Sequence, residues 1–315
     1  METETAPAGS PNLVKFVFFN DRGLRAGWRL LIYVGIIAVC NLLIRLLLSL
    51  LASKSHRPVL TDVLTPGIQI IVEAIAFLLI LLATFIMSRI ERRSLGEYGL
   101  PMKGQPVFRR FIVGYIFWGF LPLTVCLLIM RVFHAFSLGG FALRGREIAL
   151  FGFEWAIVFL LVGLAEEYLL RGYALYTLAD GIGFWPATIV MGVLFGLGHA
   201  GNPGESSIGL IGTVIFAIFA SLTLRYTGNL WLAVGAHAGW NWGQSFFYGV
   251  SDSGMRAQGH LLDPSFQGPD WLTGGTVGPE GSAVTLVLWI LMIVLFALLY
   301  RSRGPALVVT TERKT

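Results

Sequence analysis

The chain has 315 residues, of which 55% are hydrophobic and 13% are charged. A soluble domain carries about 25% charged residues, so most of this chain is solvated by lipid. The formal net charge of +5 does not indicate nucleic-acid binding, because the basic residues stand at the ends of apolar runs, where they anchor membrane helices. The alternating segments of a membrane barrel are missing from the sequence. We therefore expect an all-α protein, a polytopic bundle of membrane helices.

A membrane-spanning helix needs about 20 mostly apolar residues. Eight runs meet this requirement, at 28–51, 67–88, 111–130, 148–179, 185–202, 207–225, 229–249 and 282–301. The first run has no cleavage signal, so we expect a retained anchor. The predicted organisation is a cytoplasmic or interfacial segment at 1–27, a helical bundle at 28–301 and a cytoplasmic tail at 302–315. Residues 250–281 are rich in Gly, Pro and Asp, and we expect an exposed loop there.

The basic residues also predict the topology. An even number of spans puts both termini on one side of the membrane. If that side is the cytoplasm, the inside segments carry 16 of the 23 lysines and arginines and the outside segments 6, with Arg45 inside a span. The positive-inside rule therefore predicts cytoplasmic termini, and we expect the cell membrane as the location. Cys40 and Cys126 both fall inside apolar runs, so they indicate neither a metal site nor a disulfide framework.

Ionisable side chains in the middle of a membrane cost about 2.5–3.5 kcal/mol each and therefore need a reason. Arg45 and Glu73 are isolated, and we expect each to pair with a neighbouring helix or to face the bundle interior. Glu154 stands near the start of its span, from where its side chain can reach the interface. His134 and His260 lie outside the spans, and we expect both to be exposed.

The stretch Glu166-Glu167-Tyr-Leu-Leu-Arg171 differs from these isolated residues. Two adjacent carboxylates in an apolar helix repel each other, so the two cannot both be stable there as bare anions. Glu167 and Arg171 are spaced i,i+4 with the acid first, which is the favourable order for a helical ion pair. Glu166 then lies about 100° away on another face of the helix, free to act as an acid or a base. Taken alone, the motif fits a pair of ion-paired residues at a membrane edge equally well.

A second motif lies in the next run. The turn signal at 180–186 separates the fourth run from the fifth, and the point midway between Glu166 and His199 falls inside it. In an antiparallel helix pair, both residues would then lie roughly 20–25 Å from the tip of the hairpin. His199 ends the segment Phe195-Gly-Leu-Gly-His199, whose glycines allow a close helix approach. We therefore expect Glu166 and His199 at the same depth.

The seventh run contains His237-Ala-Gly-Trp-Asn241, and the i,i+4 spacing places the imidazole and the amide on one helix face. Two histidines, a carboxylate and an amide within lipid are hard to explain by packing. They predict one intramembrane cavity that is lined by Glu166, His199, His237 and Asn241. Phosphate-binding glycine loops, nucleophile elbows and H-E-x-x-H helices are absent from the sequence.

With these motifs the sequence resembles the CPBP family (CAAX proteases and bacteriocin-processing enzymes, also called the Abi family). That family is marked by E-E-x-x-x-R, F-x-x-x-H and H-x-x-x-N in successive membrane helices. Here the motifs are Glu166-Glu167-Tyr-Leu-Leu-Arg171, Phe195-Gly-Leu-Gly-His199 and His237-Ala-Gly-Trp-Asn241. The resemblance covers about residues 155–245, which places a CPBP core at about 148–249.

The resemblance implies about eight helices around a polar cavity, and endopeptidase activity like that of the Ras-converting CAAX endopeptidase. It also implies that Glu166 and His199 activate water, that His237 and Asn241 stabilise the oxyanion, and that Glu167 and Arg171 support the site. The chemistry of these side chains agrees, because peptide hydrolysis needs a base for water and an acid for the leaving amine. The implied partners are the lipid bilayer and a membrane-associated protein or peptide, of CAAX type or another kind.

Two alternatives remain open. A zinc protease would use Glu166, His199 and His237 as ligands with water in the fourth position. We favour the form without a cofactor, because the amide of Asn241 suits an oxyanion better than zinc. The other alternative is a non-proteolytic membrane protein, either an immunity or scaffold protein or a proton-coupled carrier. Carriers usually contain inverted repeats, and none is visible in the sequence.

Overall fold

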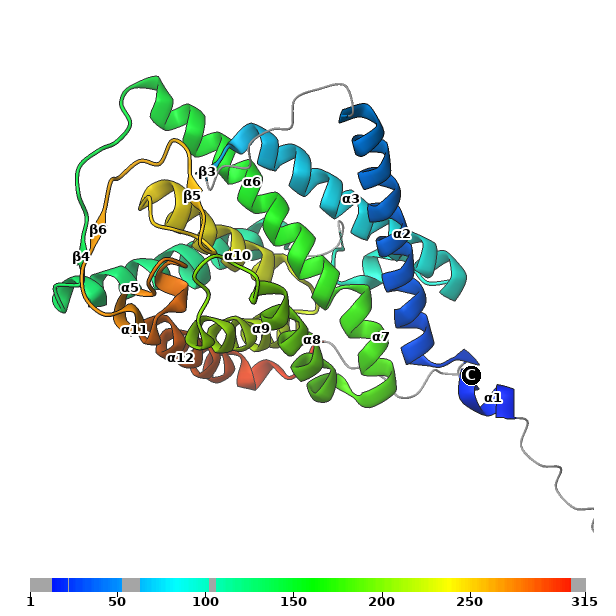
Figure 1. Cartoon of the computed structure of the whole chain (residues 1–315). Helices are drawn as coiled ribbons and strands as arrows, with labels where there is room; N and C mark the ends of the chain where they lie inside the picture. The colour runs from blue at the N-terminus through cyan, green and yellow to red at the C-terminus, as the bar shows by residue number, and fades with distance from the viewer. Residues whose placement is uncertain (1–12, 22, 53–62, 102–105, 307–315) are drawn as a thin grey trace, which may run out of the picture.

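A computed structural model of the chain describes residues 13–21, 23–52, 63–101 and 106–306 (Figure 1). Helices form the bundle, as the composition predicts. They are α2 (Ala26–Ala52), α3 (Pro66–Glu91), α4 (Val107–Val113), α5 (Leu121–Val132), α6 (Arg146–Arg171), α7 (Tyr173–Ile182), α8 (Phe184–His199), α9 (Ser207–Thr227), α10 (Trp231–Trp242) and α12 (Ala283–Tyr300). The π-helical segment η2 (Gly114–Phe120) joins α4 to α5, and η3 (Gly243–Phe247) extends α10.

Helices occupy all eight predicted runs, which confirms a polytopic helical bundle. In the part of the chain that the structure describes, six helical segments are long and apolar enough to cross a membrane, namely 26–50, 66–91, 107–132, 146–182, 207–227 and 283–300. Helix α8 is apolar but shorter. The predicted tail at 302–315 and the segment at 1–27 lie partly outside the described residues.

At one end of the bundle, short strands pair the connections between helices with one another (Figure 1). Strand β3 (Val63–Leu64), between α2 and α3, pairs in parallel with β5 (Arg256–Ala257), which lies between α10 and α12. Strand β4 (Phe136–Ser137), between α5 and α6, pairs antiparallel with β6 (Ser265–Phe266). Three connections that are distant in sequence therefore meet at the same end, as expected if successive spans alternate in direction. The remaining short elements are α1 (Leu13–Phe18), β1 (Phe19–Asn20), β2 (Gly23–Leu24), η1 (Leu95–Tyr98), α11 (Asp270–Thr273), η4 (Pro279–Gly281) and η5 (Arg301–Arg303).

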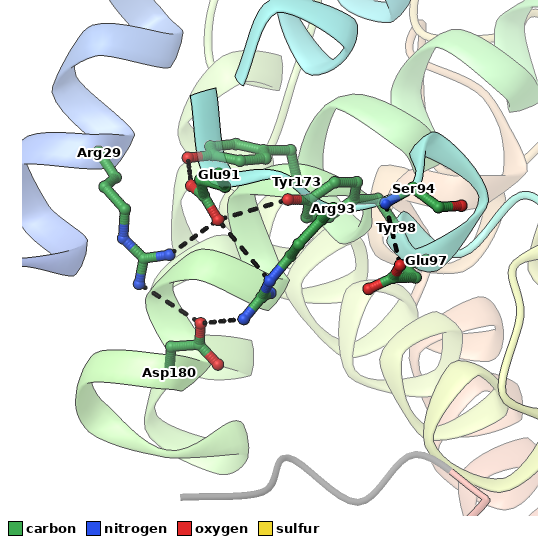
Figure 2. Close-up of polar contacts among 8 residues, drawn as sticks. All are labelled: Arg29, Glu91, Arg93, Ser94, Glu97, Tyr98, Tyr173 and Asp180. Atoms are coloured by element: carbon green, nitrogen blue, oxygen red, sulfur yellow. Dashed lines mark hydrogen bonds and ion pairs between the residues drawn. The ribbon is translucent and has the colours of Figure 1, made fainter. Parts of the chain in front are cut away.

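An ion-pair network lies at the opposite end, where α2 begins and α3 and α7 end (Figure 2). Arg29 of α2 contacts Glu91 of α3 at 3.0 Å and Asp180 of α7 at 3.4 Å. Arg93 contacts the same two carboxylates, at 3.9 and 3.4 Å. Tyr173, the first residue of α7, donates a hydrogen bond to Glu91. The network ties three helices together at the end where α6 passes into α7.

The fourth predicted run is two helices rather than one. The helix is interrupted at Gly172, between α6 and α7. A Cβ on Gly172 would lie 2.3 Å from the Tyr168 carbonyl oxygen, so this conformation needs glycine. The turn predicted at 180–186 is present at Gly183, but the hairpin that it forms joins α7 to α8. Glu166 lies on α6, so it does not belong to a straight arm of that hairpin. The prediction of equal depth for Glu166 and His199 assumed that it did, and this assumption was wrong.

The prediction of an exposed loop at 250–281 was correct only in part. Residues 265–271 are exposed, but other parts of the segment are buried, including Ala257, Thr273 and Val277, and it is anchored by β5, β6, α11 and η4. We call residues 248–282 the cap, because they cover one end of the bundle (Figure 1). His260 of the cap is half-buried and bonds to the Ala257 carbonyl, against the expectation of exposure.

Two other expectations concern single residues. His134 is exposed, as predicted. Arg45 is also exposed, on α2. No ion pair joins it to another side chain that the structure describes. The expectation that it pairs or faces the bundle interior was therefore wrong.

Helix α10 lies in the core of the bundle, and residues 232–240 are all buried. Its glycines let neighbouring backbones approach closely. A Cβ on Gly235 would lie 2.2 Å from the Phe111 carbonyl oxygen, and one on Gly239 would lie 2.1 Å from the Tyr115 carbonyl oxygen. Such contacts are how membrane helices pack without a hydrophobic driving force between them. They hold His237 and Asn241 in the interior of the protein.

Candidate active site

One cavity brings together the four residues that the sequence motifs single out. It has a volume of about 70 Å³, which is room for several water molecules, and Glu166, His199, His237 and Asn241 all line it. These residues come from α6, α8 and α10. Aromatic rings form much of the remaining wall, those of Phe195, Phe216, Trp240 and Trp289. A small polar space walled in part by apolar rings strengthens the electrostatic interactions inside it.

Glu167 and Arg171 form the predicted ion pair. Glu167 Oε1 lies 3.2 Å from Arg171 Nη1, and both side chains are completely buried. The Arg171 guanidinium also stands over the Phe195 ring, 4.8 Å from its centroid, a favourable cation–π distance. The arginine of the first motif is therefore held by the phenylalanine of the second. A buried pair of this kind costs desolvation energy, and the contact of Arg171 with Phe195 joins the end of α6 to α8.

His237 lies between the two glutamates of α6. Its Nδ1 is 3.0 Å from Glu167 Oε1, and its Nε2 is 3.7 Å from Glu166 Oε2. A carboxylate only accepts hydrogen bonds, so Nδ1 carries a proton and donates it to Glu167. Nε2 then faces Glu166 and the cavity. The approach of α6 to α10 is close because Gly163 has no side chain, and a Cβ there would lie 3.0 Å from the Val234 carbonyl oxygen.

His199 is oriented by its own helix. Its Nδ1 lies 2.8 Å from the Phe195 carbonyl oxygen, one turn earlier in α8. Because a carbonyl oxygen cannot donate, Nδ1 carries the proton and Nε2 of neutral His199 is an unprotonated base. Of the two glycines in this motif, Gly196 permits the predicted close approach, since a Cβ there would lie 2.9 Å from Val214 of α9. Gly198 faces open space.

Asn241 stands one turn after His237 on α10 and lines the same cavity. Its amide makes no hydrogen bond to any other residue that the structure describes. An amide group that faces a polar cavity without a protein partner is available to a ligand or to water. The amide and the imidazole therefore share a helix face, as the i,i+4 spacing predicts.

Several polar residues around this cavity were not predicted from the sequence. Asp252, Ser253 and Glu280 of the cap and Thr213 of α9 also line it. The cap had been interpreted as solvent-exposed from its Gly and Pro content, although its apolar residues signal burial. Glu73 of α3 interacts electrostatically with both Glu166 and His237, and it thus faces the bundle interior as expected.

The two carboxyl groups of the cap that line the cavity, those of Asp252 and Glu280, have raised pKa values. Burial, together with the nearby Glu166 carboxylate, raises the pKa of Asp252 to about 6, although a hydrogen bond from Ser245 opposes the change. Burial and the neighbouring Asp252 and Glu205 raise the pKa of Glu280 well above its usual value. Ionisable groups with such shifts tend to cluster at functional sites.

The residues of this cavity do not form an evident metal site. Within residues 13–21, 23–52, 63–101 and 106–306, no three His, Cys, Asp or Glu side chains are grouped as ligands of one ion. His237 Nδ1 is committed to Glu167 and His199 Nδ1 to the Phe195 carbonyl, so each imidazole keeps only its Nε2 for a ligand.

Comparison with known proteins adds one finding. Residues 148–243 match the family described as type II CAAX prenyl endopeptidase Rce1-like. The chain has no significant match among curated proteins or among solved structures. The matched segment runs from α6 to the start of η3 and contains all three motifs, whereas the cap residues Asp252 and Glu280 lie beyond it. This match indicates a CAAX protease, which is a hydrolase. Residues 148–243 therefore match an Rce1-like CAAX prenyl endopeptidase domain, in agreement with the resemblance of the sequence to the CPBP family.

Proposed function

We propose that this protein is an intramembrane endopeptidase that hydrolyses a peptide bond of a membrane-associated substrate, of CAAX type or another kind, without a metal ion. The observation that carries the proposal is that Glu166, His199, His237 and Asn241, from three helices, line one cavity. The cavity is large enough for the water that the reaction consumes. The Rce1-like match of the same segment supports the reaction class.

In the proposed reaction, Glu166 and His199 activate this water. The reactive atoms of both side chains accept no hydrogen bond from the described residues, because His199 donates through Nδ1 to the Phe195 carbonyl and Glu166 has no donor bonded to it. The Glu166 carboxylate takes a proton from the water while the water oxygen attacks the carbonyl carbon of the scissile peptide bond. The Nε2 of His199 accepts a hydrogen bond from the same water or shares its proton.

Asn241 and His237 stabilise the oxyanion of the tetrahedral intermediate. The amide of Asn241 has free donors. His237 already donates Nδ1–H to Glu167, so it offers a second N–H only when Nε2 is protonated too. Glu167 acts as a positioning residue for His237 in this scheme.

The proposal is tested with purified protein in lipid nanodiscs and quenched-fluorescence peptides, prenylated CAAX-type peptides and unprenylated membrane peptides. We expect cleavage of at least one class, and we expect it to continue at the same rate after the protein is stripped with a zinc chelator. Loss of activity on chelation that zinc restores would instead establish the metalloprotease. No cleavage of any peptide, with an effect of the Glu166 variant on transport or immunity, would establish a non-enzymatic function.

The oxyanion role predicts a specific kinetic effect of Asn241→Ala. The loss of one donor costs about 2.7–4 kcal/mol of transition-state stabilisation, or roughly 100- to 1,000-fold in kcat. KM should remain nearly the same, because the donor acts mainly in the transition state. Steady-state kinetics on the cleaved peptide measure both values. Asn41→Ala, an exposed amide on α2, is the control and should leave kcat unchanged. A tenfold rise in KM at constant kcat would assign Asn241 to substrate binding instead.

We further propose that the protein resides in the cell membrane with both termini in the cytoplasm, as the distribution of lysine and arginine predicts. The cap and the strand pairs would then lie on the outer side. A cysteine in place of Asp263, an exposed cap residue, should react with an impermeant maleimide on intact cells. A cysteine in place of Glu2 should react only after permeabilisation. The opposite labelling pattern would reverse the topology.

A further inference from the structure

The cap reaches the cavity through one tight turn. Residues 252–255 form it, with backbone hydrogen bonds in both directions between Asp252 and Met255. Both central residues have positive φ, 52° at Ser253 and 81° at Gly254, as a type I′ turn requires. Gly254 is needed here for a second reason, because a Cβ would lie 2.3 Å from the Pro203 carbonyl oxygen. The turn therefore has a defined position against the connection between α8 and α9.

Further bonds hold the turn from the other side. The Gly254 amide donates to the Val277 carbonyl at 3.0 Å, and the Ser253 amide donates to Glu280 Oε1 at 2.6 Å. This rigid placement puts the carboxyl group of Asp252 into the wall of the cavity that contains Glu166 and His199.

The carboxyl group of Asp252 has one oxygen engaged and one free. Ser245 Oγ donates to Oδ2 at 2.9 Å, and no other residue in the part of the chain that the structure describes donates to the carboxyl. The ionisable groups around it are Glu166 of α6, His199 of α8, His237 of α10 and Glu280 of η4. Glu280 is different, because Ser253 N–H occupies Oε1 and the Gln244 amide lies 3.5 Å from Oε2. Asp252 is thus the cap carboxyl with an oxygen available to a substrate.

The reaction proposed above assigns no group as the donor of the proton that the leaving amine needs. Glu166 and His199 take up the proton of the water, and Asn241 and His237 hold the oxyanion. An amide nitrogen is expelled only when it receives a proton, since a free amide anion is far too basic to leave. We propose that Asp252, which lies outside the Rce1-like segment, is the general acid that protonates the leaving amine in this cavity. This inference rests on the proposed peptidase function.

The proton balance closes with the groups present. The water oxygen bonds to the carbonyl carbon while its proton passes to Glu166. The carbon–nitrogen bond then breaks, its electron pair stays on nitrogen, and nitrogen takes the proton of Asp252. Glu166 returns the proton of the water to Asp252 through water in the cavity. The net change is the addition of one water molecule across the peptide bond. A pKa near 6 suits the donor, because it keeps an appreciable protonated fraction near neutral pH.

The test uses two substrates that differ only at the scissile bond. One is the peptide that the wild-type protein cleaves, and the other is the same peptide with a thioester in place of the amide. A thiolate leaves without protonation, so only the amide needs the acid. We expect Asp252→Asn to lower kcat on the amide by about 100- to 10,000-fold and to change kcat on the thioester less than about tenfold. Glu166→Gln should lower both, because both reactions need activated water.

Asp263→Asn is the matched control, an exposed aspartate of the same cap, and should leave both rates unchanged. If Asp252→Asn does not fold, Ser245→Ala replaces it, because loss of the Ser245 hydrogen bond loosens Asp252 and should slow the amide selectively. An equal loss on both substrates, or full activity on the amide, would overturn the role of Asp252 as general acid. The proposed peptidase function would still stand. If the wild-type protein cleaves neither substrate, the proposed peptidase function is wrong, and the inference fails with it.

Discussion

Glu166→Gln should abolish proteolysis in a protein that still folds and inserts. The amide has the shape of the carboxylate but cannot take a proton from water, so we expect kcat to fall about 100- to 10,000-fold. Stability should change little, because Glu166 accepts no hydrogen bond from the described residues and is one-third exposed to the cavity. Initial rates on the cleaved peptide and thermal unfolding of the purified variant measure the two effects.

The control for this variant is Glu147→Gln, which removes an exposed carboxylate from the first turn of the same helix. It should leave both the rate and the unfolding temperature unchanged. A Glu166→Gln protein with the full rate of the wild type would end the proposed mechanism. A parallel loss of rate and of unfolding temperature would show that Glu166 is needed for folding instead.

Glu167→Gln should have the largest effect on stability. Glu167 and Arg171 are completely buried and 3.2 Å apart, so this change leaves the Arg171 charge in the interior without its anion. Breaking a buried pair from one side costs about 3–5 kcal/mol. Turnover should fall as well, because His237 loses the carboxylate that holds its Nδ1–H. Unfolding in mixed micelles gives the free energy, and the peptide assay gives kcat.

A double variant separates the two roles of Glu167. Glu167→Gln combined with Arg171→Met removes both charges, and an uncharged replacement of a buried pair is often neutral for stability. We therefore expect the double variant to regain most of the lost free energy of unfolding, although the Phe195 ring loses its cation. Turnover should stay low, since His237 still lacks its carboxylate. Recovery of turnover together with stability would remove the positioning role of Glu167.

The parts of this site that depend on neighbours within one helix could be predicted from the sequence. Glu167 and Arg171 pair because four residues are one helical turn, and His237 and Asn241 share a face for the same reason. The eight hydrophobic runs likewise predict the long helices of the bundle. Each of these patterns is local, so the properties of one helix decide it.

Contacts between elements could not be predicted in this way. The bond from His237 to Glu167 joins residues on α6 and α10, and it depends on a close approach at Gly163 that sequence spacing does not show. The break at Gly172 was hidden because the apolar pattern continues through it. The prediction that Glu166 and His199 lie at equal depth assumed an uninterrupted helix from residue 166 to the turn at 180–186.

Hydrophobicity and helical periodicity are local properties, and they were enough to predict a membrane helical bundle, three motifs that resemble those of a protease family and the candidate residues on each helix. The packing of the helices was needed to bring these residues into one cavity and to place His237 between two carboxylates. Packing also decides which parts of the cap are buried. Gly, Pro and Asp are typical of exposed turns, but the same residues can form a tight turn that is buried when other loops cover it. Asp252 lies in the cavity wall because its neighbours Ser253 and Gly254 contact Pro203, Val277 and Glu280. These three residues are distant in sequence, and no local pattern encodes such contacts.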